Sequence, residues 1–235
     1  NKAKSFNLST RIDPVDAIAL GVSDVIPIEI TSSYATIANR GIYNSPIGIS
    51  HIEDQHGRVI KRYVSDQIEV VDESLNHLIL DMMKDVIDSG TGGSIRWKYK
   101  FNTPMAGKTG TTNNKTDAWF IGFTTDIAIA VWVGIDDPKM KLGEKQYGSK
   151  AALPIFAYTI KEIYDLKEYQ FYNEKVKLDK KSDWEMLDGV IQKNICKETC
   201  CLSTEWCDSY VEYFLENNIP QEACEEFSNP LFRFK

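Results

Sequence analysis

Three strand-like stretches separated by very short connections place the strongest constraint on the fold of this 235-residue chain. They span approximately residues 105–112, 117–124 and 127–135, and the third is an uncharged, apolar run of nine residues. Parallel neighbours need a crossover of a dozen or more residues, so connections of only two to four residues require antiparallel pairing. The sequence therefore predicts an antiparallel sheet in the middle of the chain.

Three segments have the spacing of amphipathic helices, with apolar residues three and four positions apart. They are Ile28–Asn39, Asp72–Ile87 and Ala151–Tyr164. Residues 47–53 and 58–63 alternate apolar and polar side chains around a turn, which predicts a hairpin. We expect the glycine-rich residues 89–93 to form a flexible segment at the rim of a site. The predicted fold class is α+β, with helices packed on an antiparallel sheet.

The first of the three strands carries an unusual combination of side chains: Lys108, Thr109, Gly110, Thr111 and Thr112. Glycine weakens the interior of a strand unless another molecule approaches its backbone closely. A cation and hydroxyl groups beside that bare backbone suit an anionic, peptide-like ligand. The same order of residues is the K-T-G element of serine acyltransferases that react with penicillin.

Composition excludes several other classes of protein. The net charge is −7, and residues 166–235 hold nine basic and 14 acidic side chains, so nucleic acid is not an expected partner. The longest uncharged apolar run is too short to cross a bilayer as a helix. The first residues do not resemble a signal peptide, so we expect the start to be internal to a longer protein. No pattern calls for a cofactor.

All five cysteines lie within 29 residues of one another: Cys196, Cys200, Cys201, Cys207 and Cys224. There is no C-x-x-C pair, and the histidines lie far upstream, so we favour disulfides over a zinc site or simple free thiols. The odd count leaves at least one thiol unpaired or joined elsewhere. Composition also shifts near residue 166, which predicts one unit at residues 1–165 and a cysteine-bearing extension at residues 166–235.

Several segments between about residues 15 and 160 form an ordered series: Ala19–Gly21, Ser23–Pro27, Ser33–Asn39, Gly90–Gly92, Ala106–Thr112, Asp117–Gly122 and Val131–Gly134. In this order they resemble the C-terminal half of the transpeptidase domain of class A (bifunctional) penicillin-binding proteins. The tail is similar to that family's C-terminal extension, although Cys200 and Cys201 depart from its pattern. The resemblance implies part of a β-lactamase-like, penicilloyl-serine-transferase fold with a small disulfide-bearing appendage.

The resemblance also implies serine acyl transfer on the D-Ala-D-Ala stem peptides of peptidoglycan, with β-lactams acylating the same serine. Lys108 would then be a cation beside the substrate carboxylate and a conduit for protons. The hydroxyls of Thr109 and Thr111 would bind that carboxylate, and the Thr111 N–H would be half of an oxyanion hole. Gly110 would let the substrate lie alongside the strand, and Thr112 would lie at the edge of the pocket.

The family also needs an S-x-x-K element with the nucleophile and an S-x-N element, and the chain contains no S-x-x-K. Ser5-Phe6-Asn7 spells S-x-N, but it lies so close to Ala19–Gly21 that we interpret it as part of a loop. We expect the nucleophile, a glycosyltransferase domain and a membrane anchor elsewhere in a parent protein on the extracytoplasmic face of the bacterial membrane. The alternatives are a β-lactamase or D,D-carboxypeptidase, and a non-catalytic wall-binding or scaffold module.

Overall fold

The computed structural model describes residues 2–112, 114–135, 137, 140–166, 169–171, 174–176 and 178–223. Its centre is an antiparallel sheet with the order β5 (Ala106–Thr111), β6 (Asp117–Phe123) and β7 (Ala128–Gly134). This confirms the predicted α+β fold and the antiparallel pairing. In the part of the chain that the structure describes, no helix combines the length and the apolar character needed to cross a membrane.

The three predicted helices are present as α2 (Pro27–Ala38), α3 (Glu73–Asp88) and α5 (Gly148–Asp165). Proline suits the first position of α2, because its fixed φ is already helical and its missing N–H would have no partner there. The Asp72 side chain caps α3 by accepting a hydrogen bond from the N–H of Leu75 at 3.1 Å. Helix α5 begins three residues before its predicted start. The sequence pattern missed the first turn because that turn is polar, contains glycine and lacks the apolar spacing of the rest of the helix.

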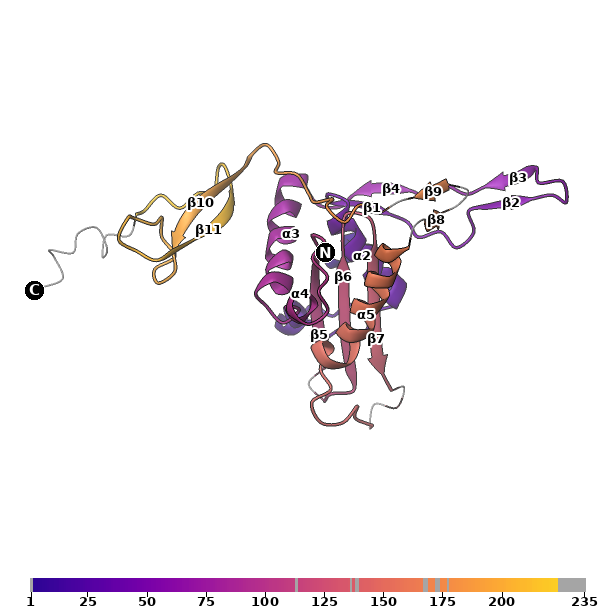
Figure 1. Cartoon of the computed structure of the whole chain (residues 1–235), viewed down its shortest axis with the longest axis horizontal. Coiled ribbons are helices and arrows are strands. Elements are labelled where there is room, and N and C mark those ends of the chain that lie inside the picture. The colour runs from indigo at the N-terminus through magenta and orange to yellow at the C-terminus, as the bar shows by residue number, and fades with distance from the viewer. Residues whose placement is uncertain are drawn as a thin grey trace, which may run out of the picture.

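The sheet lies between α5 on one face and α2 on the other (Figure 1). Successive side chains of β6 point to opposite faces, so Phe120 and Phe123 serve different layers. Phe120 packs edge-on against Phe156 of α5, with ring centroids 4.7 Å apart. Phe123 packs against Tyr34 of α2, with centroids 6.2 Å apart. Both phenylalanines are fully buried, so each anchors one half of the core.

Smaller elements surround this body. They are α1 (Lys2–Ser5), the 3₁₀ helix η1 (Asp16–Leu20), α4 (Ser94–Trp97) and four two-stranded antiparallel pairs, namely β1 (Ile42–Asn44) with β4 (Gln67–Glu69), β2 (His51–Glu53) with β3 (Val59–Arg62), β8 (Tyr169–Phe171) with β9 (Glu174–Val176), and β10 (Val190–Cys196) with β11 (Ser209–Leu215). The β2–β3 pair confirms the predicted hairpin, with shorter strands, and projects from the body (Figure 1).

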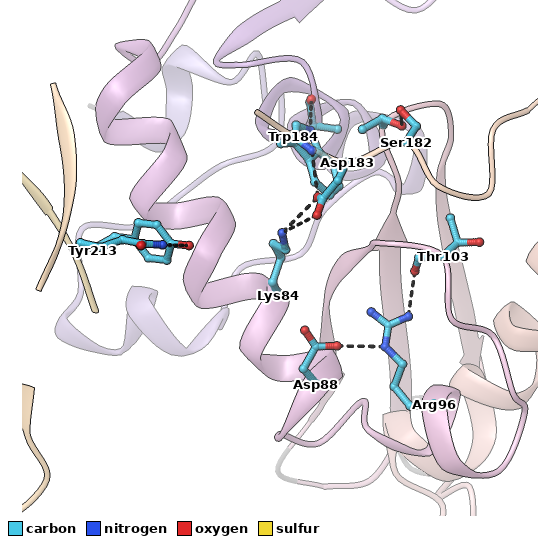
Figure 2. A network of polar contacts seen from close by, with 11 residues as sticks. Lys84, Asp88, Arg96, Thr103, Ser182, Asp183, Trp184 and Tyr213 are labelled. Carbon is cyan, nitrogen blue, oxygen red and sulfur yellow. Dashed lines mark hydrogen bonds and ion pairs between the residues drawn. The ribbon is translucent and has the colours of Figure 1, made fainter. Parts of the chain in front are cut away.

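The segment that follows β9 packs on the body before it reaches the β10–β11 hairpin. The indole N–H of Trp184 donates to the Ala38 carbonyl at 2.8 Å, and its ring lies 5.8 Å from that of Phe123. Asp183 accepts hydrogen bonds from the Lys84 ammonium of α3 at 3.0 and 3.2 Å (Figure 2). Part of the predicted extension at residues 166–235 is therefore integrated with the sheet-and-helix body. The boundary at residue 166 stays a prediction.

Residues 89–93 are fixed by hydrogen bonds, in contrast to the loose rim expected from their composition. The N–H of Gly92 donates to the Val86 carbonyl at 2.8 Å, and the N–H of Gly93 donates to the Gly90 carbonyl at 3.1 Å. A Cβ on Gly90 would lie 2.8 Å from the Val86 Cα, closer than real Cβ contacts. Here glycine permits the chain to fold tightly against the last turn of α3.

Arg96 of α4 joins the end of α3 to the chain that leads into β5 (Figure 2). Its guanidinium binds the Asp88 carboxylate at 2.9 Å and donates to the carbonyls of Phe101 and Thr103 at 3.0 and 2.8 Å. The side chain is largely buried, with 22% of its surface exposed, so these bonds are partly shielded from water. They hold the segment before the motif strand in place.

Candidate active site

The motif residues lie along β5 and at its end, on the outer strand of the sheet. Among the described strands, β5 pairs only with β6. Hydrogen-bonded and non-hydrogen-bonded pairs alternate along an antiparallel ladder. Because the Thr112 N–H donates to the Asp117 carbonyl at 3.2 Å, the register makes the even-numbered residues of β5 bond to β6. The N–H groups of Thr109 and Thr111 therefore point away from β6, as a backbone donor to a ligand must.

The motif side chains divide between the two faces of the strand. Thr109 and Thr111 share one face, and Lys108 and Gly110 share the other, because successive residues alternate. The exposed Lys108 ammonium folds back and donates to the Thr109 carbonyl at 3.0 Å. Since that carbonyl belongs to the unpaired side of the strand, the structure places a cation and an outward N–H along one edge.

The Thr109 hydroxyl has a partner from a different part of the chain. Its oxygen lies 2.8 Å from the hydroxyl oxygen of Thr91, and either group can donate. Thr91 belongs to the fixed loop at residues 89–93 that ends α3. The contact therefore ties that loop to the motif strand.

The Thr111 hydroxyl oxygen accepts a hydrogen bond from the N–H of Gly148, at 3.1 Å. Gly148 is the first residue of α5, and the residue before it, Tyr147, supplies no side-chain cap. The first N–H groups of a helix have no partner within it, so Thr111 satisfies one of them. A Cβ on Gly148 would overlap the carbonyl oxygen of Trp119 and lie 2.6 Å from that of Gly110. Only glycine allows α5 to begin this close to the motif.

The Thr112 hydroxyl is used differently, because it closes the turn between β5 and β6. It accepts hydrogen bonds from the N–H groups of Thr116 and Asp117 at 3.1 and 3.0 Å. It also lies 2.9 Å from the Thr116 hydroxyl, which donates to the Asp117 carboxylate at 2.7 Å. A hydroxyl has one donor and two acceptor positions, and these contacts occupy all three. This favours a structural role over the predicted place at the edge of a pocket.

Sequence reasoning therefore identified the motif but missed two residues that contact it, Thr91 and Gly148. Thr91 lies within a glycine-rich segment that the sequence does place near a site, and this was an available signal. Gly148 had none, because a glycine before a helix is common and its contact depends on how α5 packs. Ser5, in the S-x-N-like segment, ends α1 and donates to the Lys2 carbonyl at 2.7 Å.

The cysteine-bearing hairpin differs from the sequence expectation. No disulfide joins Cys196, Cys200, Cys201 and Cys207, and Cys224 lies outside the described residues. Burial opposes ionisation of the Cys196 thiol, but hydrogen bonds from Thr199, from the backbone of residue 198 and from Cys207 prevail and lower its pKa to about 7. The sulfur of Cys196 is thus held by hydrogen bonds in the turn after β10. The predicted disulfides are not present among these four residues.

An antiparallel sheet covered by helices, with K-T-G on an outer strand, is the arrangement of penicilloyl-serine-transferase domains. The profile described as "Penicillin binding protein transpeptidase domain" matches residues 15–161, and that of "Penicillin-binding protein 1A, C-terminal domain" matches residues 186–229. The chain belongs to the penicillin-binding protein transpeptidase family.

Individual relatives agree with this assignment. The chain is 31% identical over 217 residues to penicillin-binding protein 1A of Aquifex aeolicus. That match covers 92% of this chain and 28% of the relative. It is 35% identical over 176 residues to penicillin-binding protein 1A of Rickettsia prowazekii, which covers 65% of this chain and 22% of the relative. The chain therefore spans about a quarter of the length of these two proteins.

Solved structures show the same fold. Penicillin-binding protein 1A from Haemophilus influenzae superposes with a TM-score of 0.81 at 22% identity, over 94% of this chain and 37% of that chain. PonA1 from Mycobacterium tuberculosis superposes with a TM-score of 0.60 at 23% identity, over 69% of this chain and 48% of that chain. The first of these similarities extends over nearly the whole chain.

Proposed function

We propose that this chain is the substrate-binding part of a peptidoglycan D,D-transpeptidase that is acylated by β-lactams. The observation that carries the proposal is the arrangement on β5. An outward N–H at Thr111 and the Lys108 ammonium lie along the unpaired side of the motif strand, and the hydroxyls of Thr109 and Thr111 share one face of it. This combination suits a peptide that ends in a carboxylate and develops negative charge on a carbonyl oxygen.

In the proposed reaction a serine hydroxyl attacks the carbonyl carbon of the penultimate D-alanine. The Thr111 N–H stabilises the oxygen that becomes negative, together with the N–H of the nucleophile itself. The bond to the last D-alanine breaks, that residue leaves with a proton on its amine, and the acyl group passes to an amine of a neighbouring stem. Lys108 and the hydroxyls of Thr109 and Thr111 hold the terminal carboxylate and keep it aligned.

The nucleophile must come from outside this chain, which contains no S-x-x-K. We propose that a longer parent protein supplies it, along with the S-x-N element, a glycosyltransferase domain and a membrane anchor, and that the site faces the extracytoplasmic side. The similarity to relatives of which the chain spans about a quarter supports this arrangement.

Labelling with a fluorescent penicillin tests the proposal. We expect no covalent labelling of the isolated chain, and serine-dependent labelling of the full-length parent. In the parent, Lys108→Ala should slow acylation roughly 10- to 150-fold, the effect of losing a hydrogen bond to a charged group. Lys61→Ala removes an exposed lysine of β3 and should leave the rate unchanged. Strong serine-dependent labelling of the isolated chain would refute the claim that it lacks the nucleophile.

The absence of S-x-x-K also favours one second candidate, a non-catalytic module that binds the wall through the same pocket. The two differ in the parent sequence and in its chemistry. A parent that lacks S-x-x-K, and that binds stem peptides without being acylated, would establish the module. Rapid release of the bound β-lactam after acylation would instead indicate a β-lactamase.

A further inference from the structure

The two motif hydroxyls to which the proposed function assigns the carboxylate, those of Thr109 and Thr111, each have a hydrogen-bond partner outside the strand, and the two partners differ in kind. Thr111 accepts from a backbone N–H of α5, whereas Thr109 meets the side-chain hydroxyl of Thr91. Thr112, which follows them, is fully used by its turn. The three hydroxyls therefore differ in whether they can still donate a hydrogen bond to a ligand.

The hydrogen-bond inventory of Thr111 leaves its own proton available. A hydroxyl donates once and accepts twice. The Gly148 N–H can only donate, so it occupies a lone pair of the Thr111 oxygen at 3.1 Å. Among the described residues, no group accepts the Thr111 hydroxyl proton. Thr111 is thus polarised as a donor toward the exposed side of the strand.

The Thr109 hydroxyl can likewise donate its proton to a ligand in only one arrangement of the Thr91–Thr109 hydrogen bond. At 2.8 Å one hydroxyl must donate to the other, and in the free protein either direction is possible. Once a carboxylate accepts the Thr109 proton, the contact persists only if Thr91 donates to the Thr109 oxygen. The order is then Thr91 to Thr109 to carboxylate, and each bond in such a chain strengthens the next.

Thr91 is also held where it can do this. Hydrogen bonds from the N–H groups of Gly92 and Gly93 close the loop, and Gly90 packs against the Val86 backbone. Arg96 further ties α4, just beyond the loop, to the end of α3 and to the segment before β5. Thr91 is an exposed residue, and the backbone that precedes and follows it is held by these contacts.

We propose that Thr91 is a positioning residue for carboxylate recognition, donating to the Thr109 hydroxyl so that Thr109 donates to the C-terminal carboxylate of a stem peptide or to the carboxylate of a β-lactam. The Gly148 N–H likewise donates to the Thr111 hydroxyl oxygen, so that Thr111 donates its own proton to the same carboxylate. This inference rests on the proposed function. Thr91 acts through Thr109 and does not itself touch the ligand.

Stopped-flow acylation of the full-length parent by benzylpenicillin tests this inference, because it separates the dissociation constant of the initial complex from the rate constant of acylation. Thr91→Val keeps the shape of the side chain and removes the hydroxyl. We expect the dissociation constant to rise about three- to tenfold, the effect of one hydrogen bond, while the acylation rate constant changes less than twofold. Thr91→Ser restores the donor and should restore binding.

Thr31→Val is the matched control, because the exposed Thr31 hydroxyl bonds only to the Pro27 carbonyl within α2, among the described residues. It should leave both constants unchanged. The inference is overturned by unchanged binding in Thr91→Val, by a loss confined to the acylation step, or by Thr91→Ser being as impaired as Thr91→Val. A loss of the same size in Thr31→Val would overturn it as well. If the wild-type parent is not acylated at all, the proposed function fails, and this inference fails with it.

Discussion

Replacing Gly148 by alanine tests how closely α5 approaches the motif strand. A Cβ at this position would overlap the Trp119 carbonyl oxygen and lie 2.6 Å from that of Gly110. Both obstacles are backbone atoms in paired strands, so they cannot rotate away as a side chain would. Helix α5 or the motif strand has to shift, and the Gly148 N–H then loses its position at Thr111.

The size of the effect follows from two opposing contributions. Forcing an extra methyl group into a filled space costs about 1–3 kcal/mol. Alanine favours a helix over glycine by up to about 1 kcal/mol, which offsets part of that cost. We expect a net loss of about 1–2 kcal/mol. For a chain of this size that corresponds to a fall in melting temperature of roughly 2–8 °C.

Thermal unfolding followed by circular dichroism measures this loss, with Gly48→Ala as the matched control. Gly48 has no atom within 4 Å of the position of a Cβ, and its φ is not in the left-handed region. Its replacement should be neutral or stabilise the chain by about 0.4–1 kcal/mol, because alanine restricts the unfolded state. Equal melting temperatures for the two variants would refute the close contact between α5 and β5.

Two further predictions concern stability. Burial and neighbouring carboxylates raise the pKa of Asp81 to about 6, so the folded state binds a proton more tightly than the unfolded state between about pH 4 and 6. The melting temperature should fall as pH rises through that window and should fall less in Asp81→Asn; equal slopes in both proteins would contradict this. The Tyr164 hydroxyl donates to the Asp126 carboxylate at 2.9 Å and lies 2.7 Å from the buried Thr124 hydroxyl, which donates to it because the Thr124 oxygen already accepts from two N–H groups. Tyr164→Phe should therefore cost about 1.5–3 kcal/mol in urea unfolding, whereas Tyr158→Phe, at an exposed ring, should cost nothing.

Local patterns were sufficient for most of the secondary structure. The helices at Pro27–Ala38 and Glu73–Asp88 follow from apolar spacing and from the residues at their ends. The three-stranded sheet follows from connections too short for any other pairing. These signals involve residues close together in the chain, so they do not depend on how the elements later pack.

Partnerships between distant residues could not be predicted in the same way. The sequence shows three threonines in one motif, but it does not show that Thr112 is used by its turn while Thr111 keeps a free donor. Nor does it show the absence of disulfides among the four described cysteines, because spacing carries no information on where the sulfur atoms point.

The sequence by itself thus determined the family, the three main helices, the central sheet and the motif that marks the candidate site. Only the tertiary structure decided which motif hydroxyls remain available, by bringing Thr91 and Gly148 to them from outside the strand. The physical reason is that a hydrogen bond needs a partner within about 3 Å. That proximity arises only when α3, α5 and β5 pack together, and the local pattern of each element does not encode it.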